Sequence, residues 1–329
     1  MPIAFSFSWR FFVFGLIFVS SLILLILNYR LPEEYDYYKS MRNLKVFFVL
    51  VLASVLFSCS DDDTTLNSEP NLIVRFKFDP NQVRLNNIGQ PSSIPAENAA
   101  QTPIFNGISA HYFELAPTAY TQLGNGTVLY HAPETDAGGN IAIDFDQAIV
   151  VDEGEAFLKI PLSQVAQGNY EYVRVSLSYQ NFGVSILNNG INYDATVVSF
   201  VGFNTYLTTH YIGNNAFPVN GNRLQGYWAF ALNDYPYATS GQSSRTTVPN
   251  PIANTSPIPA GSCVVTGKFV NNLVINGTEK QDVEIELSLS INNSFEWNEV
   301  NFDGKYEPAA GENVVDMGLR GLIPSFRKN

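Results

Sequence analysis

The sequence predicts an all-β protein, an antiparallel β-sandwich of about ten strands in a single domain over residues 71–329. Three observations support this prediction. Apolar and polar residues alternate along most of the chain after residue 70, and no segment there has the apolar spacing of an amphipathic helix. Glycine-containing pairs that suit tight turns interrupt the alternating segments. Hydrophobic residues make up 46% of the 329 residues, which is enough for a sizeable core.

The alternation is clearest in three segments. They read NLIVRFKFD from residue 71, YEYVRVSLSY from residue 170 and DVEIELSLSIN from residue 282. Each has an apolar residue at every second position, so we expect strands with one buried face and one solvated face. Further strands are expected at residues 108–115, 127–132, 140–145, 156–162, 195–203, 205–212, 226–232 and 262–270.

Two apolar stretches precede this domain. The first, residues 11–27, has nearly the ~20 residues that span a bilayer. The second follows a short basic start at Met41 and ends at Cys59, which is the pattern of a signal peptide over residues 41–58. A membrane helix directly before a complete signal is redundant, so we interpret residues 1–40 as a non-native N-terminal extension. A genuine extra membrane segment is the alternative.

The residues Leu56-Phe57-Ser58-Cys59 resemble a bacterial lipobox. This resemblance implies cleavage before Cys59 and lipidation of its thiol and amine. Each buried CH₂ contributes roughly 0.8 kcal/mol and stable anchoring takes about two chains, so a triacylated cysteine would hold the protein on a membrane. The expected first partner of the chain is therefore a membrane, through its lipid.

An acidic, flexible tether follows over residues 59–70. Its first residues, Ser60, Asp61, Asp62 and Asp63, resemble the export signal of surface-exposed lipoproteins of the Bacteroidota. The resemblance implies an outer-membrane protein exposed on the cell surface.

Charge and cysteine content give two further expectations. Cleavage before Cys59 would remove five basic and three acidic residues, so the net charge would move from -12 to -14. Such a surface repels phosphate backbones, so we expect no nucleic-acid partner. The second cysteine, Cys263, lies in an apolar strand-like segment and is expected to be a small core residue.

Residues 235–262 are rich in Pro, Ser, Thr and Gly and are expected to form a long loop. The segment is either a disordered loop or a ligand-binding loop with Tyr235 and Tyr237 at its base.

A calcium-loop pattern occurs near the C-terminus. Glu299, Asn301, Asp303 and Gly304 approximate the spacing D-x-[DN]-x-[DN]-G, in which alternate oxygen side chains surround a hard cation. Ala310 stands at position twelve, where a glutamate belongs, and Glu307 or Glu312 is a possible substitute. A plain polar β-turn is the alternative to this Ca²⁺ site.

The three histidines, His111, His131 and His210, lie in separate strand-like segments and form no metal-binding motif. We therefore expect them to be half-buried structural residues. The chain has no G-x-S-x-G elbow, P-loop, dinucleotide fingerprint or zinc-protease motif, so we do not expect an enzyme.

The block IPLSQVAQGNYEYVRVSLSY and the later GYWAFAL resemble passages of MbnP-like (methanobactin-associated copper-binding) β-sandwich proteins. This resemblance implies a sandwich fold. It also implies copper binding through histidine and tryptophan, which here points to His210 and Trp228.

Together these features predict a non-catalytic surface lipoprotein that binds a glycan or protein ligand through loops and exposed aromatic residues. A metal-handling lipoprotein for copper or calcium is the alternative. A hydrolase with an unrecognised site is the third function left open.

Overall fold

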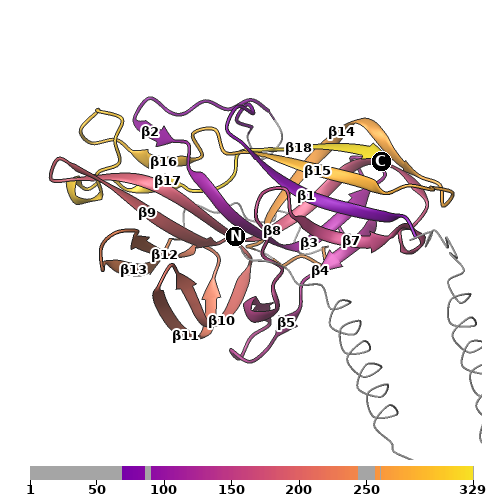
Figure 1. Ribbon diagram of the computed structural model, residues 1–329, viewed down its shortest axis with the longest axis horizontal. Coiled ribbons are helices and arrows are strands. Elements are labelled where there is room, and N and C mark those ends of the chain that lie inside the picture. The colour runs from indigo at the N-terminus through magenta and orange to yellow at the C-terminus, as the bar shows by residue number, and fades with distance from the viewer. Residues whose placement is uncertain (1–68, 86–89, 244–255, 260, 329) are drawn as a thin grey trace, which may run out of the picture. The chain divides into compact units, whose positions relative to one another are not determined.

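We analysed a computed structural model, which describes residues 69–85, 90–243, 256–259 and 261–328 (Figure 1). These residues belong to one compact unit, Ser68–Asn329. They form eighteen strands, three short 3-10 helices and no α-helix, so the predicted all-β fold is confirmed. No helix among them is long and apolar enough to cross a membrane. The predicted extension, signal peptide and lipidation site lie outside the described residues.

Two large sheets carry most of the chain. The first has the order β18-β15-β1-β7. Its strands are β1 (Asn71–Asp79), β7 (Ala156–Pro161), β15 (Val283–Ser290) and β18 (Leu322–Lys328). The second has the order β13-β12-β9-β8-β3-β4, with β14 beside β8. Its strands are β3 (Ile104–Ala116), β4 (Thr127–His131), β8 (Gly168–Asn188), β9 (Ile191–Phe200), β12 (Tyr227–Leu232), β13 (Ala238–Gln242) and β14 (Cys263–Ile275).

Two smaller sheets complete the unit, with the orders β11-β10-β6-β5 and β17-β16-β2. Their strands are β2 (Asn98–Gln101), β5 (Glu134–Thr135), β6 (Ala142–Asp144), β10 (Asn204–Ile212), β11 (Asn215–Leu224), β16 (Phe295–Asn298) and β17 (Val314–Asp316). The 3-10 helices are η1 (Phe145–Gln147), η2 (Leu162–Gln164) and η4 (Pro308–Ala310).

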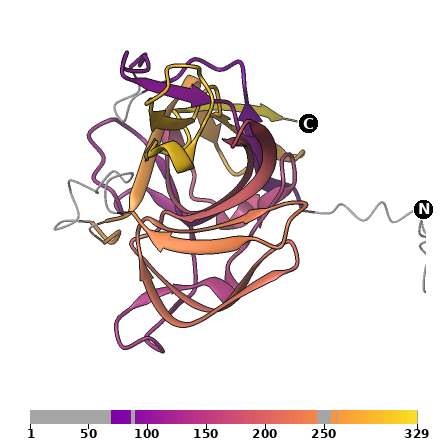
Figure 2. The ribbon, with the colours of Figure 1, turned by 90° about the vertical axis from the view of Figure 1, so that its left-hand side faces the viewer.

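The main core lies between the two large sheets. In β1, Leu72, Val74, Phe76 and Phe78 are all buried, as their alternation predicts. They join one hydrophobic cluster with residues of β3, β8, β14 and β15. Full burial of each such side chain contributes about 1.5–3 kcal/mol. Figure 2 shows indigo β1 and the yellow C-terminal strands on one side of the orange strands of the β10–β12 region.

Strand pairing differs from the prediction at two places. Most neighbouring strands are antiparallel, but β1 pairs with β15 in parallel, and β10 pairs with β6 in parallel. Strand β1 lies between β7 and β15, so the first described strand is inserted between strands from later in the chain. Alternation predicts which face of a strand is buried, but it does not specify the direction of the neighbouring strand.

The expectation of a solvated second face is wrong for the middle of β8. Ser176 and Ser178 are 1% and 3% exposed, although both lie on the polar face. The chain that follows β9 lies against this part of β8, because Val201 and Gly202 donate backbone hydrogen bonds to the carbonyl of Ser178 at 2.9 and 3.2 Å. Tertiary packing therefore covers a strand face that the sequence pattern assigns to solvent.

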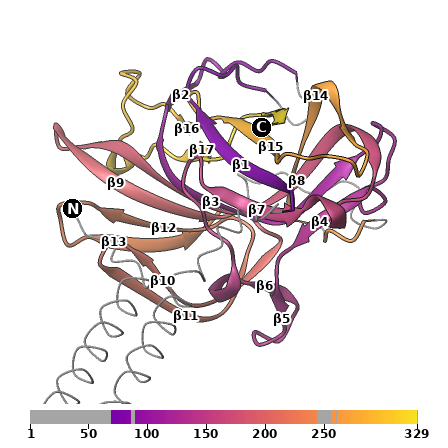
Figure 3. The same ribbon diagram turned by 45° about the vertical axis from the view of Figure 1, so that its right-hand side comes forward.

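Strands β10 and β11 pack against the outer face of β9 and β12. Phe200, Leu207, Ile212 and Tyr227 form a second hydrophobic cluster there. In Figure 3 β10 and β11 lie on the side of β12 away from β1 and β15.

Part of the predicted loop 235–262 is a strand. Residues 238–242 form β13, which pairs along its length with β12. Small, polar residues at a sheet edge give no alternation, so the sequence pattern could not predict this strand.

Candidate metal centre

The candidate site is a group of three side chains at the junction of β3, β4 and β5. His111 lies in β3, His131 is the last residue of β4, and Glu134 is the first residue of β5. One donor atom of each lies within 4.8 Å of the others. Among the described residues, this is the group of His, Cys, Asp and Glu side chains that is close enough to hold a metal ion.

A β-bulge positions His111. Ala110 is paired with Leu177 and Tyr112 with Ser176, so His111 is the extra residue of β3 against β8. A bulge bends its strand and re-aims a side chain, and bulges are common beside functional sites. The His111 ring contacts that of Phe203 with 5.2 Å between centroids.

His131 and Glu134 are placed by the end of the β3–β4 pairing. His131 is the partner of Tyr112, and the amide of Ala132 donates to the carbonyl of His111 at 2.7 Å. The carbonyl of Pro133 accepts a hydrogen bond from the amide of Asp144, which holds the start of β5 next to β6. The adjacent strands β3 and β4, with β5 directly after β4, thus bring residues 111, 131 and 134 together.

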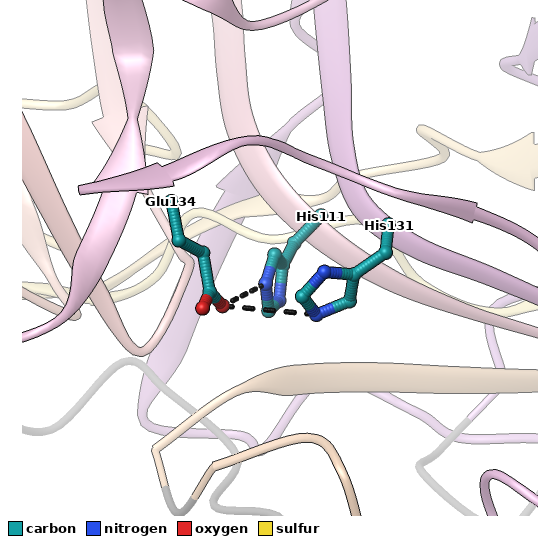
Figure 4. A group of neighbouring side chains, drawn as sticks. All are labelled: His111, His131 and Glu134. Atoms are coloured by element: carbon teal, nitrogen blue, oxygen red, sulfur yellow. Dashed lines mark hydrogen bonds and ion pairs between the residues drawn. The ribbon is translucent and has the colours of Figure 1, made fainter.

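The three donor atoms converge in Figure 4. The Nε2 of His111 lies 2.9 Å from Oε1 of Glu134, and the Nε2 of His131 lies 3.7 Å from the same oxygen. Tetrahedral coordination with bonds of about 2.0–2.2 Å separates donor atoms by about 3.3–3.6 Å. The two observed distances lie on either side of this range, so side-chain shifts of under about 1 Å would create the coordination geometry.

Exposure differs among the three side chains. His111 is fully buried, whereas the side chains of His131 and Glu134 are 41% and 27% exposed. Burial and, to a smaller extent, the neighbouring His131 lower the pKa of His111 to about 4, although the hydrogen bond and charge of Glu134 oppose this shift. The neutral imidazole is the form that binds metal, so His111 is ready for coordination across the neutral pH range.

The second ring nitrogen of His111, Nδ1, limits the affinity of the site for a metal ion. This nitrogen is buried and has no hydrogen-bond partner among the described residues. When Nε2 of a histidine binds a metal, the proton resides on Nδ1, and metal-binding histidines usually donate that proton to an acceptor. His111 would carry a buried, unpaired N–H in the metal-bound form, which weakens binding.

Sequence reasoning missed this group. It treated His111 and His131 as structural histidines because they are twenty residues apart in sequence and form no motif. The signal that was present is a pair of neighbouring strand-like segments, each with one histidine, followed by a glutamate. That signal becomes specific only when the bulge in β3 is known.

His210, the predicted copper ligand, is 4% exposed and lies in an aromatic cage. Its ring stacks on Phe217 at 5.0 Å, and its Nε2 is 3.4 Å from the hydroxyl of Tyr227. Trp228 packs against a different cluster, with Phe182 and Phe295. The structure therefore does not bring the two predicted copper ligands into one cluster.

The predicted calcium residues form a loop that is organised by hydrogen bonds to backbone amides. Glu299 Oε1 accepts from Asp303 and Gly304, and Glu312 accepts from Val300 and Glu307. The side chains of Asn301 and Glu307 also bond to each other. The carboxylates of this loop do not form a close group of three among the described residues.

One oxygen of this loop, Oε2 of Glu299, is buried without a hydrogen-bond partner among the described residues. The Ca²⁺ site stays a prediction.

The two predicted ligand-binding tyrosines are exposed. Tyr235 is 54% exposed and contacts Tyr193, whereas Tyr237 is 55% exposed and contacts Phe230. Cys263 lies at the start of β14 against the main core, and burial raises its pKa to about 12. Its thiol is therefore protonated and unreactive at neutral pH. Cys59 and the residues Ser60, Asp61, Asp62 and Asp63 lie outside the described part of the chain.

Comparisons of the chain with protein families, with curated proteins and with solved structures find no match. The resemblances to surface lipoproteins of the Bacteroidota and to MbnP-like proteins therefore depend on the sequence motifs alone.

Proposed function

We propose that this protein is a surface-anchored lipoprotein that binds one divalent transition-metal ion at His111, His131 and Glu134. The observation that carries the proposal is the convergence of two imidazole nitrogens and a carboxylate oxygen, with separations of 2.9 and 3.7 Å from that oxygen. This proposal corresponds to the metal-handling lipoprotein that the sequence analysis gave as the alternative function.

The donor set indicates the class of ion. Imidazole suits zinc, copper, iron and nickel, whereas calcium and magnesium prefer oxygen ligands alone. Glu134 supplies one negative charge and the two histidines supply neutral nitrogens. Because His131 and Glu134 are partly exposed, solvent has access to a fourth coordination position. The site is thus an open one with three protein ligands.

The proposal also includes the lipid anchor at Cys59 and the sandwich architecture of the folded domain. Lipidated Cys59 would hold the protein on the outer membrane, the aspartates after it would direct it to the cell surface, and residues 59–70 would tether the folded part. That folded part is a single antiparallel sandwich domain in outline, with the two large sheets as its layers. Its function requires no catalytic step.

The test is a metal titration of the full-length protein in detergent. Co²⁺ is added first, because tetrahedral Co²⁺ absorbs strongly in the visible region, and Zn²⁺ and Cu²⁺ then compete for the same site. We expect one Co²⁺ per chain and its displacement by Zn²⁺ and Cu²⁺. His131→Ala and Glu134→Gln should each weaken binding at least tenfold, because each removes one of three ligands.

Asp136→Asn is the matched control, since Asp136 is an exposed carboxylate two residues after Glu134 and outside the group. Equal Co²⁺ affinity in the wild-type protein and in both ligand variants would refute the proposal.

A further inference from the structure

A groove of about 460 Å³ lies between β12 and β13 on one side and the segment of residues 306–317 on the other. Its side chains include Trp228 and Phe230 from β12, Tyr237 before β13, and Tyr306 from the opposite segment. We call this surface the aromatic groove. It shares no residue with the candidate metal centre.

Strand alternation and one glycine place the aromatic rings. Trp228 and Phe230 are two residues apart in β12, so they share a face, opposite to that of Tyr227. Gly241 is the cross-strand partner of Trp228 in β13. A Cβ at position 241 would lie 2.6 Å from the indole ring, so the ring rests over the glycine, where a larger residue would displace it. The indole therefore packs against Gly241 beside the groove.

Tyr237 lies at the rim. Its side chain is 55% exposed and meets the ring of Phe230 edge to face, with centroids 6.3 Å apart. The rim also has polar groups. Thr239 lies in the lining, and Asn313 is held there by a hydrogen bond from its Nδ2 to the carbonyl of Gly311 at 2.9 Å. The groove thus combines flat aromatic surfaces with uncharged hydrogen-bonding groups.

The groove has no free charge. Glu312 is the charged residue of its lining, and it is 3% exposed. Both of its oxygens accept hydrogen bonds from backbone amides, from Val300 at 3.0 Å and from Glu307 at 2.6 Å. An anionic ligand would find no cation here, and the chain as a whole has a net charge of -12. The surface is therefore complementary to an uncharged ligand.

We propose that the aromatic groove binds the uncharged sugar rings of an oligosaccharide. The C–H face of a sugar ring packs on an aromatic face, while its hydroxyl groups require uncharged donors and acceptors around it. The volume lies within the 300–1,000 Å³ typical of small-molecule sites. An extended peptide would have to pair with β13, the edge strand of this sheet, because β12 is already paired with β9 and β13, and β13 (ATSGQ) offers it no large apolar side chain. Of the ligands expected from the sequence, these contacts favour a glycan over a protein.

The test uses the full-length protein in a zwitterionic detergent, because alkyl glycosides would compete for a sugar site. The probes are cellobiose, maltose, lactose and chitobiose, with binding measured by saturation-transfer NMR and calorimetry. At least one of these disaccharides should bind. Tyr237→Ala should weaken that binding about fivefold, since an exposed aromatic face is lost.

Tyr235→Ala is the matched control, because Tyr235 is equally exposed, two residues away, and outside the groove. Its affinity should stay within about twofold of the wild-type value. Trp228→Phe keeps an aromatic ring with a smaller face and should also weaken binding, which preserves the test if Tyr237→Ala does not fold. The proposal is overturned if none of the four disaccharides binds, or if the tyrosine variants have equal affinities. It is also overturned if a heparin-derived anionic disaccharide or an extended peptide library binds more tightly.

Discussion

Replacing Glu114 by alanine is expected to destabilise the folded protein by about 3–5 kcal/mol. Glu114 lies in β3 and is fully buried. Its Oε2 accepts hydrogen bonds from the hydroxyl of Tyr112 at 3.0 Å and from the amide of Gly124 at 2.8 Å, and its Oε1 accepts from the amide of Gly126 at 2.7 Å. Arg174 lies 3.9 Å from Oε1.

The magnitude follows from what the truncation would leave behind. Each hydrogen bond to a charged group contributes about 1.5–3 kcal/mol, and three are lost. Removing one member of a buried ion pair costs about 3–5 kcal/mol, because the other charge stays buried. Water reaching the partly buried amides of residues 124 and 126 offsets part of the loss, so the two estimates are not added. With about 2–4 °C per kcal/mol, the melting temperature should fall by about 6–20 °C.

Glu114 also lies next to the segment that leads to the candidate metal centre. Residues 124–126 lead directly into β4, which ends at His131, so the carboxylate fixes the connection between the two histidine-bearing strands. The assay is urea unfolding followed by circular dichroism, together with Co²⁺ titration. Glu114→Gln retains one oxygen acceptor and should lose less, about 1–3 kcal/mol. Glu286→Ala, at an exposed position of β15, is the control and should stay within ~0.5 kcal/mol of wild type. A loss below ~1 kcal/mol for Glu114→Ala would refute this account of the carboxylate.

Four further outcomes are expected. Cys59→Ala should release the protein from membranes and abolish labelling by palmitate; retained label would remove the lipoprotein interpretation. Changing residues 61–63 to alanine should preserve lipidation yet protect the domain from protease added outside the cell. If the protease still cleaves the variant as it cleaves the wild-type protein, the aspartates serve only as part of the tether. If the C-terminal loop binds Ca²⁺, millimolar Ca²⁺ should raise the melting temperature above that in EDTA or Mg²⁺, and Asp303→Ala should lose the response; identical melting in Ca²⁺ and EDTA would identify a plain turn. Burial, with the nearby charge of Arg223, lowers the pKa of His210 to about 4. Its stabilising contribution is therefore intact above pH 6.5 and is lost as the pH falls toward 4, since only the unfolded chain binds the proton in that window. Between pH 7 and pH 5, the free energy of unfolding measured in urea should fall by about 2 kcal/mol more for the wild-type protein than for His210→Gln. An equal dependence of this free energy on pH in the two proteins would contradict the prediction.

Much of the strand content was predictable from the sequence, because a strand with one buried face has an apolar residue at every second position. In β15, Val283, Ile285, Leu287 and Leu289 are all 1% exposed or less, as their alternation predicts. Strands β2, β5, β11, β13, β16, β17 and β18 were not predicted, and they account for the difference between about ten strands and eighteen. Strand β11 shows the reason: it is an edge strand with a proline, and its residues alternate between partial burial and exposure.

The candidate sites were predictable to different degrees. Tyr237 could be identified as an exposed aromatic residue from its loop composition, but its contact with Phe230 depends on β13, which has no alternation. His111 could not be placed, because a strand without a bulge would have turned its side chain to the other face of the sheet. The pairing of β13 with β12 decides the aromatic groove, and the bulge of β3 against β8 decides the position of His111; apolar alternation along one strand specifies neither.

The geometry of the candidate metal centre differs from that of a structural zinc site. A structural zinc site has four protein ligands and contributes about 10–16 kcal/mol of folding free energy. Here three side chains lie at the end of a hairpin, while the main core is formed by residues of the two large sheets and includes none of them. Binding would leave the Nδ1 proton of His111 buried and unpaired, which costs about 1–3 kcal/mol, or about 5- to 150-fold in affinity. If the proposed site binds an ion, we therefore expect the fold to form without it and the ion to exchange.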